Sequence, residues 1–206
     1  NNIGRRLTRD GKWNHVINGN CDWVYEEEFG FTRAFDWSPN SRFLAFYRFD
    51  ESNVKEFTIP MYNDLYPDNY TYKYPKAGEA NSVVDIKIFD FKTEATVNAI
   101  VGQGKDQYIP RIKWSNDPSK LCIYKLNRLQ NKLTLLLADA ATGKHEVIYK
   151  ETNPYYIQVS DALTFLKDGN SFIFESEKDG YEHLYHYNWE TEKMTLLTKG
   201  KYDIAG

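Results

Sequence analysis

The chain has 206 residues, enough for one hydrophobic core, and 16% of them are aromatic, which favours β-strands over helices. Its 26 basic and 29 acidic side chains give a net charge of −3, which leaves no basic stripe for nucleic acid and no polybasic patch for a membrane surface. Two cysteines, Cys21 and Cys122, are too few for a disulfide framework or a zinc site, so we expect two buried free thiols.

The first distinctive element is an acidic run between large apolar residues, DWVYEEEFGF at Asp22–Phe31. As a strand, the run would send Glu27 to the face opposite Glu26 and Glu28; as a helical turn, it would spread all three around the axis. Unpaired carboxylates are costly to desolvate, so the triplet is expected at a surface. The run is then either a solvated acidic surface or a rigid site for a cationic ligand.

Farther along, an aromatic residue, a polar turn and an alternating apolar strand recur three times, at Trp37–Phe46, Trp114–Tyr124 and Phe165–Phe174. Turns rich in Pro, Asn, Asp and Gly are typical of β-hairpins. A second signature follows each hairpin, in which Asp or Asn opens a turn and Thr leads into another strand. Its threonines are spaced 49 residues apart, at Thr93, Thr142 and Thr191. A four-stranded unit at this period indicates a β-propeller blade.

We therefore predict an all-β fold, a partial β-propeller domain over residues 1–206 that forms an arc of about three four-stranded blades. The blades are expected at about 12–100, 101–149 and 150–199. Propellers have roughly four to eight blades, so three cannot close a ring. We expect the chain to be a piece of a longer protein, since it begins with Asn1 and carries an incomplete ring.

The first blade is longer than the others and is predicted to carry two insertions. About 26 extra residues fall between its second and third strands, at Glu51–Ala80, and about 13 fall before its first strand and include the glutamate run. Connections of these two kinds emerge on one face of a blade, so we expect the insertions to lie beside each other. The tyrosine-rich run Tyr62–Tyr74 is expected to be a loop packed by its own rings. Long loops on a rigid scaffold are where function concentrates.

The residues themselves indicate no catalytic centre, no cofactor and no metal site. No Gly-x-Ser-x-Gly nucleophile elbow occurs in the sequence. His183 and His186 are predicted on opposite faces of one strand, which disfavours a metal site there.

The acidic run resembles a segment of dipeptidyl peptidase IV and its relatives in the prolyl oligopeptidase class, and the style of the sequence looks bacterial. The resemblance continues in order along nearly the whole chain, through DWSPNSRFLAFYRFDES, YPKAGEAN, FLKDGNSFIF, DGYEHLYHY and LLTKGKYDIAG. It implies that the arc belongs to an eight-bladed, amino-terminal propeller domain.

In this family the second and third glutamates of the Tyr-Glu-Glu-Glu run hold the free α-amino group of a peptide substrate. The resemblance assigns that role to Glu27 and Glu28, with Trp23 and Tyr25 as supporting residues. It implies a serine exopeptidase that releases Xaa-Pro or Xaa-Ala dipeptides, in which this portion gates the substrate and anchors its amine. The Ser-Asp-His triad belongs to the carboxy-terminal α/β-hydrolase domain of the parent, absent from this chain, which is therefore expected to be inactive alone.

The resemblance also implies peptide substrates with a free amino terminus, a homodimeric parent and a location outside the cytoplasm; no nucleic-acid partner is expected. Some members of the family have an aromatic–arginine pair where this chain has Tyr156–Val159, so that secondary contact is not carried over. Two alternatives stay open. One is a relative that releases tripeptides; the other is a propeller module that only binds a protein partner, with Glu51–Ala80 as its contact surface.

Overall fold

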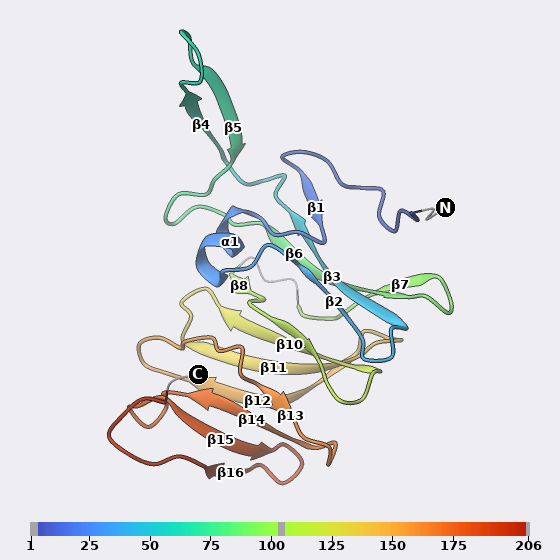
Figure 1. The fold of residues 1–206 in the computed structure, drawn as a ribbon, viewed down its shortest axis with the longest axis vertical. Helices are drawn as coiled ribbons and strands as arrows, with labels where there is room; N and C mark the ends of the chain where they lie inside the picture. The colour runs from blue at the N-terminus through green and yellow to red at the C-terminus, as the bar shows by residue number, and fades with distance from the viewer. Residues whose placement is uncertain (1–3, 103–105, 205–206) are drawn as a thin grey trace. The chain divides into compact units, whose positions relative to one another are not determined.

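The computed structural model describes residues 4–102 and 106–204; predictions that touch residues 1–3, 103–105 and 205–206 lie outside this part of the chain. The described residues form antiparallel β-sheets with one short helix (Figure 1). The all-β partial propeller predicted from the repeats is confirmed.

The first sheet has the strand order β7–β6–β3, and both β1 and β2 pair with β3. Its strands are β1 (Val16–Asn18), β2 (Phe35–Trp37), β3 (Phe43–Asp50), β6 (Val83–Asp90) and β7 (Ala95–Asn98).

The second sheet repeats this plan with the order β12–β11–β10, and both β8 and β9 pair with β10. The third has the order β13–β14–β15–β16. The strands of these two sheets are β8 (Gln107–Tyr108), β9 (Ile112–Trp114), β10 (Lys120–Asn127), β11 (Lys132–Asp139), β12 (His145–Thr152), β13 (Thr164–Phe165), β14 (Ser171–Ser176), β15 (His183–Asn188) and β16 (Lys193–Leu196).

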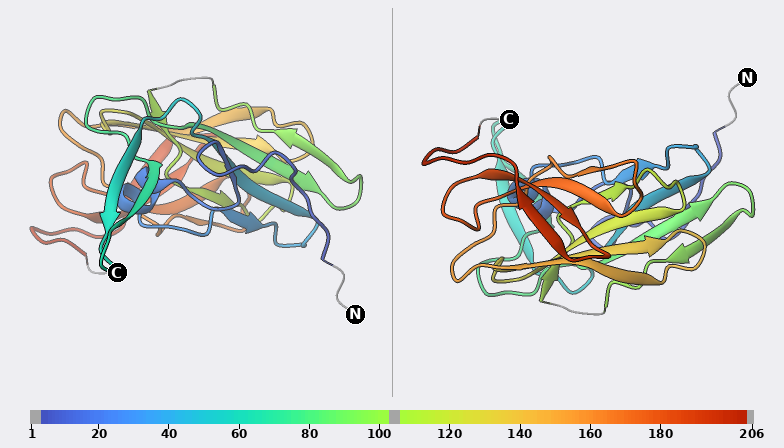
Figure 2. Two further views of the ribbon diagram at one scale, coloured as in Figure 1. Left: turned by 90° about the horizontal axis from the view of Figure 1, so that it is seen from above. Right: turned by 90° about the horizontal axis from the view of Figure 1, so that it is seen from below.

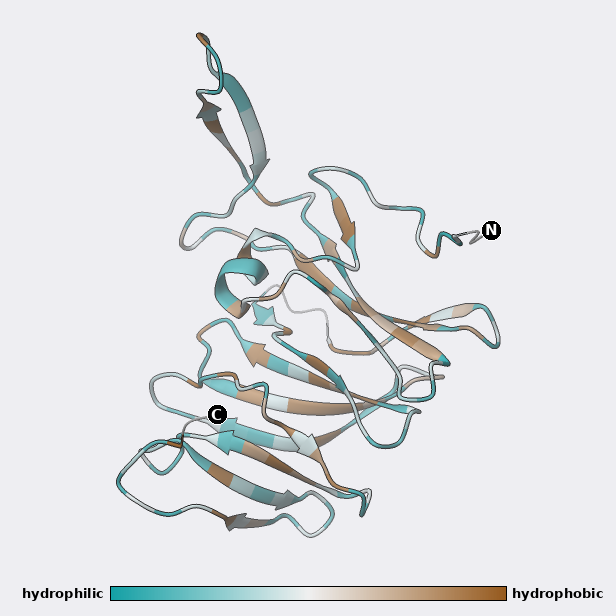
Figure 3. Ribbon diagram, in the orientation of Figure 1, coloured by the Kyte–Doolittle hydropathy of each residue, from teal (hydrophilic) through white to brown (hydrophobic). Residues whose placement is uncertain are grey.

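The central strands of each sheet are the most apolar. The sequence FLAFYRFD of β3 buries five of its eight residues, and LTLLLA within β11 buries five of its six. The outer strand β16, with the sequence KMTL, buries none of its four residues. A sheet whose inner strands are covered on both faces and whose outer strand meets solvent is the pattern expected of a propeller blade. Figure 3 shows the apolar colour in the central strands.

The repeated polar signatures are turns closed by their own side chains. Asp139 accepts hydrogen bonds at Oδ1 from the backbone N–H and the hydroxyl of Thr142, at 3.0 and 2.8 Å. Asn188 does the same with Thr191, at 3.0 Å for both bonds. The Asp/Asn-to-Thr spacing recurs because each such turn needs an acceptor at its start and a donor three residues later.

The described residues separate into two compact units, which we describe individually. The first unit holds residues 4–35 and 46–87; the second holds residues 36–45, 88–102 and 106–204.

Successive sheets in the second unit are joined by side chains of the first repeated signature. Trp114 Nε1 donates to the carbonyl oxygen of Asp36 at 3.2 Å, and its ring stacks on Phe43 with centroids 6.0 Å apart. On the other side, Asn116 Nδ2 donates to the carbonyl oxygen of Phe165 at 2.9 Å. The signature at Trp114–Tyr124 therefore contacts strands of both neighbouring sheets.

Both predicted insertions fall in the first unit. Most of Glu51–Ala80 is a hairpin formed by β4 (Glu56–Met61) and β5 (Asp68–Lys73), whose strands run side by side in Figures 1 and 2. The prediction of a loop packed by its own rings is wrong at the tip, where Tyr62, Leu65 and Tyr66 are 77%, 93% and 85% exposed. It holds near the base, where the rings of Tyr72 and Tyr74 lie 5.9 Å apart.

The second insertion does not precede the first strand of its blade, as the spacing predicted, but interrupts it. The chain leaves the edge of β3 at Gly19, whose N–H donates to the carbonyl oxygen of Tyr47 at 3.0 Å. It returns at Ala34, whose carbonyl oxygen accepts from the N–H of Tyr47 at 2.9 Å. Residues 20–33 are thus an excursion that starts and ends opposite one residue of β3, and they carry the glutamates.

Candidate functional site

The glutamate run lies on a helix, α1 (Trp23–Phe29). Its start is set by Asp22, an extended N-cap residue whose Oδ1 accepts from the N–H of Tyr25 at 3.0 Å. Its end is set by Gly30, which adopts a left-handed conformation at φ 68° and donates its N–H to the carbonyl oxygen of Glu26 at 3.1 Å. Asp22 and Gly30 are thus standard start and stop signals of a helix, and glycine is the residue that adopts this φ without strain.

One side of α1 is fixed by aromatic packing. Tyr25 is 1% exposed, and its ring lies 4.9 Å from that of Phe49 and 5.1 Å from that of Phe29. Tyr25 and Phe29 are four residues apart and share one helix face, so both face the core of the first unit. Tyr25 therefore anchors α1 to the core by packing.

A buried polar contact fixes the start of the helix as well. Asp22 is 7% exposed, and Ser82 Oγ donates to its Oδ2 at 2.5 Å. Burial raises the pKa of Asp22, against the lowering effect of these hydrogen bonds. Asp22 and Ser82 were not predicted as functional residues, although an Asp three residues before Tyr25 and a glycine after Phe29 are readable cap signals.

Trp23, the other residue predicted to support the site, packs on a neighbouring aromatic ring. Its ring lies 4.2 Å from that of Tyr74, which follows the β4–β5 hairpin. This contact joins the helix to the Glu51–Ala80 insertion, so the prediction that the two insertions lie beside each other is confirmed.

Glu26, Glu27 and Glu28 are all exposed. The last turn of the helix holds no basic residue, and the C-terminal end of a helix carries partial negative charge. Glu27 and Glu28 sit in the half of the helix where that charge adds to their own. The arrangement therefore attracts a cation, and an ammonium group can donate to two carboxylates at once.

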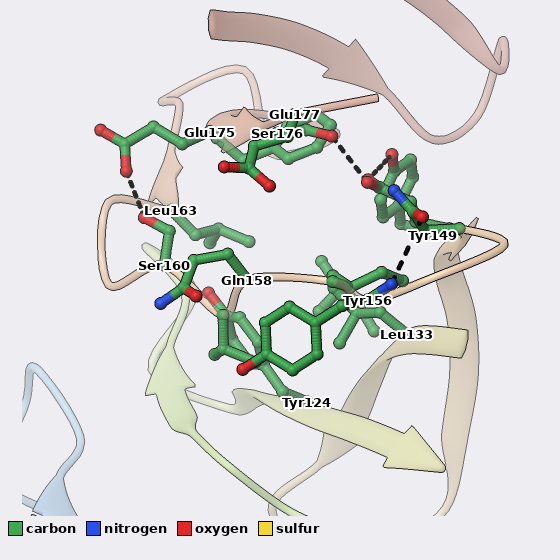
Figure 4. Close-up of a pocket in the computed structure, with 16 residues that line it drawn as sticks. Tyr124, Leu133, Tyr149, Tyr156, Gln158, Ser160, Leu163, Glu175, Ser176 and Glu177 are labelled. Carbon is green, nitrogen blue, oxygen red and sulfur yellow. Dashed lines mark hydrogen bonds between the residues drawn. The ribbon is translucent and has the colours of Figure 1, made fainter. Parts of the chain in front are cut away.

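A separate small cavity in the second unit, about 30 Å³ in volume, holds further carboxylates (Figure 4). Its Glu151 accepts from Tyr149 Oη and Ser176 Oγ, each at 2.6 Å, and Glu175 accepts from Ser160 Oγ. Burial beside Glu151 raises the pKa of Tyr149 above its ordinary value. These carboxylates already have donors, so we interpret the cluster as a structural network. Gln158, from the segment Tyr156–Val159, also lines this cavity.

The two cysteines are free thiols, as predicted, but only Cys122 is fully buried. Cys21 is half-buried, and burial together with the charges of Glu26 and Asp22 raises its pKa to about 11. Both thiols are protonated at neutral pH and are weak nucleophiles.

Comparison with known proteins identifies the family. Residues 2–206 match the family described as the dipeptidyl peptidase IV (DPP IV) N-terminal region. Among curated relatives, the chain is 31% identical to dipeptidyl peptidase 4 of Bos taurus, covering 100% of this chain and 30% of that protein. It is 32% identical to dipeptidyl aminopeptidase B of Saccharomyces cerevisiae, covering 98% of this chain and 26% of that protein.

Solved structures agree with the sequence comparisons. The chain superposes on the crystal structure of Porphyromonas gingivalis dipeptidyl peptidase 4 with a TM-score of 0.89 and 40% identity, over 97% of this chain and 29% of that one. The chain thus spans about 30% of the length of the relatives it matches. Because the match extends over essentially the whole chain, the protein belongs to the family of the dipeptidyl peptidase IV N-terminal region.

Proposed function

We propose that this chain is the substrate-gating and amine-anchoring part of a propeller domain in a serine exopeptidase that releases Xaa-Pro or Xaa-Ala dipeptides. In this proposal Glu27 and Glu28 hold the free α-ammonium group of the peptide, while Trp23 and Tyr25 keep the helix in place. A carboxy-terminal α/β-hydrolase domain of the same parent supplies the catalytic triad.

The observation that carries the proposal is the construction of α1. A seven-residue helix is too short to be stable by itself. Here both ends are capped, and the helix is packed through Tyr25 and bonded through Asp22 to Ser82. An acidic surface that only keeps a protein soluble needs no such support. Carboxylates held in fixed positions are what recognition of an ammonium group requires.

Anchoring the amine would set which peptide bond is cut. The carboxylates fix one end of the substrate, so the bond presented to the nucleophile lies a constant number of residues away. Each charge-assisted hydrogen bond to the ammonium group is worth roughly 1.5–3 kcal/mol. The names of the relatives, dipeptidyl peptidase 4 and dipeptidyl aminopeptidase B, support release of dipeptides.

The test compares cleavage of Gly-Pro chromogenic substrates with free and with acetylated amino termini by the full-length protein. Glu27→Ala and Glu28→Ala are each expected to lower kcat/KM for the free-amine substrate roughly 30-fold or more. This corresponds to a loss of at least about 2 kcal/mol of transition-state stabilisation. Glu26→Ala is the matched control, since it removes an exposed carboxylate from the same helix. Equal cleavage of both substrates, with unchanged variants, would reject the anchor.

A second candidate function is protein binding through the β4–β5 hairpin. The exposed apolar side chains at its tip favour it, since a group of exposed aromatic and aliphatic residues marks an interaction site. We propose that in a homodimeric parent this tip contacts a protein surface.

The proposed peptidase function also implies a location outside the cytoplasm. Secretion of a tagged full-length protein would test that location.

A further inference from the structure

The first unit contains a hollow of about 730 Å³ that the proposed amine anchor does not use. It lies between β1 with the turn that precedes it, the start of α1 and strand β5. Its volume is within the range of small-molecule sites, which span about 300–1,000 Å³. Glu27 and Glu28 are not among the residues that line it, whereas Glu26 is.

One wall of the hollow holds a buried carboxylate with an unused hydrogen-bonding capacity. Glu51 is only 6% exposed, and its side chain makes no hydrogen bond or ion pair in the part of the chain that the structure describes. Asp22, which also lines the hollow, is buried too, but its oxygens accept from Tyr25 and Ser82. Among the described residues, Glu51 is therefore the buried acidic group of this wall that lacks a donor, whereas Glu26 is exposed.

Burial and neighbouring negative charges disfavour the ionised form of Glu51, and Lys73 offsets this only in part. Burial raises the pKa of Glu51, and the negative charge of Asp22 raises it further, while Lys73 lowers it. Lys73 does not donate a hydrogen bond to Glu51. Its Nζ donates instead to the carbonyl oxygen of Val54 at 2.8 Å and lies 3.5 Å from Glu56 Oε1. A cation bound in the hollow would offset the desolvation of Glu51.

Other parts of the wall are aromatic. Trp13 is 68% exposed and Tyr70 is 47% exposed, and their rings meet edge to face with centroids 6.1 Å apart. Trp23 and Tyr72 complete this side of the hollow. Aromatic rings attract cations through their negative faces, and large exposed rings beside buried acids contribute little to a core.

We propose that this hollow binds a guanidinium group, such as the side chain of an arginine in a peptide. A planar guanidinium stacks on aromatic rings and donates in a fork that fits a carboxylate, whereas a compact ammonium does only the second well. A metal ion fits less well, since the described residues contain no group of three or more His, Cys, Asp or Glu side chains suited to one. The site is independent of the proposed amine anchor, because different carboxylates form it.

The experiment is calorimetric titration of the full-length protein with N-acetyl-argininamide and with N-acetyl-citrullinamide. Citrulline has nearly the same shape as arginine but no charge, and the acetyl group removes the free amine that Glu27 and Glu28 would hold. The arginine probe is expected to bind at least about tenfold more tightly than the citrulline probe. Glu51→Gln should weaken binding of the arginine probe at least about tenfold, while Glu27→Gln should leave it unchanged.

A second variant covers the case in which Glu51→Gln does not fold. Trp13 is mostly exposed, so Trp13→Ala removes a wall of the hollow without disturbing the core, and it should weaken the arginine probe about threefold. The proposal is overturned if the two probes bind equally, if neither binds, or if Glu51→Gln binds as tightly as the unaltered protein. Loss of free-amine preference in the cleavage assay would instead reject the anchor and leave this result standing.

Discussion

The cap of α1 predicts how firmly the glutamates are held. Asp22→Ala removes the acceptor of two hydrogen bonds, one from the N–H of Tyr25 and one from Ser82 Oγ. Loss of an N-cap costs about 1 kcal/mol, and a hydrogen bond to a charged acceptor is worth about 1.5–3 kcal/mol. Burial raises the pKa of Asp22, so removing the carboxylate also recovers a desolvation cost. We therefore take the lower end, a net loss of about 2 kcal/mol in the local stability of the helix.

Hydrogen exchange of the full-length protein measures this loss directly. The amides of Trp23–Phe29 should exchange roughly 30-fold faster in Asp22→Ala, with little change in the second unit. Asp22→Asn keeps a good N-cap and should lose less than about 1 kcal/mol, and Ser82→Ala should fall between the two. The KM for a free-amine Gly-Pro substrate should rise in the same order. Unchanged exchange and unchanged KM in Asp22→Ala would refute the idea that this cap positions the carboxylates.

Three further outcomes are expected. The hydrogen bond from Arg42 holds the pKa of Asp90 well below its usual range. The pair therefore stabilises the fold above about pH 4, and this contribution is lost as the pH falls. Arg42→Met removes the pair, so the decrease of Tm below about pH 4 should be less steep in this variant. Gly143→Ala should destabilise by at least about 2 kcal/mol in chemical unfolding, because a Cβ would meet backbone atoms, whereas Gly169→Ala, at φ 80° in open space, should cost only about 1 kcal/mol. Leu65→Ser, at the exposed hairpin tip, should change stability by less than about 0.5 kcal/mol. If the tip contacts the second copy in the proposed homodimeric parent, sedimentation of the full-length protein should show weaker dimerisation, and unaltered dimerisation would exclude the tip.

The sheets could be predicted from the sequence because their signals are local. The turn residues, the apolar strands and the 49-residue interval between Thr93, Thr142 and Thr191 are all readable within short windows. The caps of α1 are local as well, but three consecutive carboxylates have no periodicity that separates a helix from a strand. The Asp22 and Gly30 signals would have decided it.

Two features were beyond the sequence for a physical reason. Glu51 lines one hollow together with residues of β1, α1 and β5, and these elements are separated along the chain. Interruption of a strand also leaves no local mark, since the residues near Gly19 and Ala34 read as ordinary ends of a loop. Spacing alone measured the extra length but assigned it to the wrong side of β1.

Because the excursion interrupts a strand, its length can change without a change in the pairing of β1 with β3. Gly19 and Ala34 are both pinned to Tyr47, and the register of β1 on β3 is fixed before the excursion begins. Adding or deleting a residue between Gly19 and Ala34 would leave that register intact while it changes the position of α1, and with it the positions of Glu27 and Glu28. If these carboxylates measure the substrate, a lineage can change the number of residues released per cut by altering one short segment, without redesigning the blade.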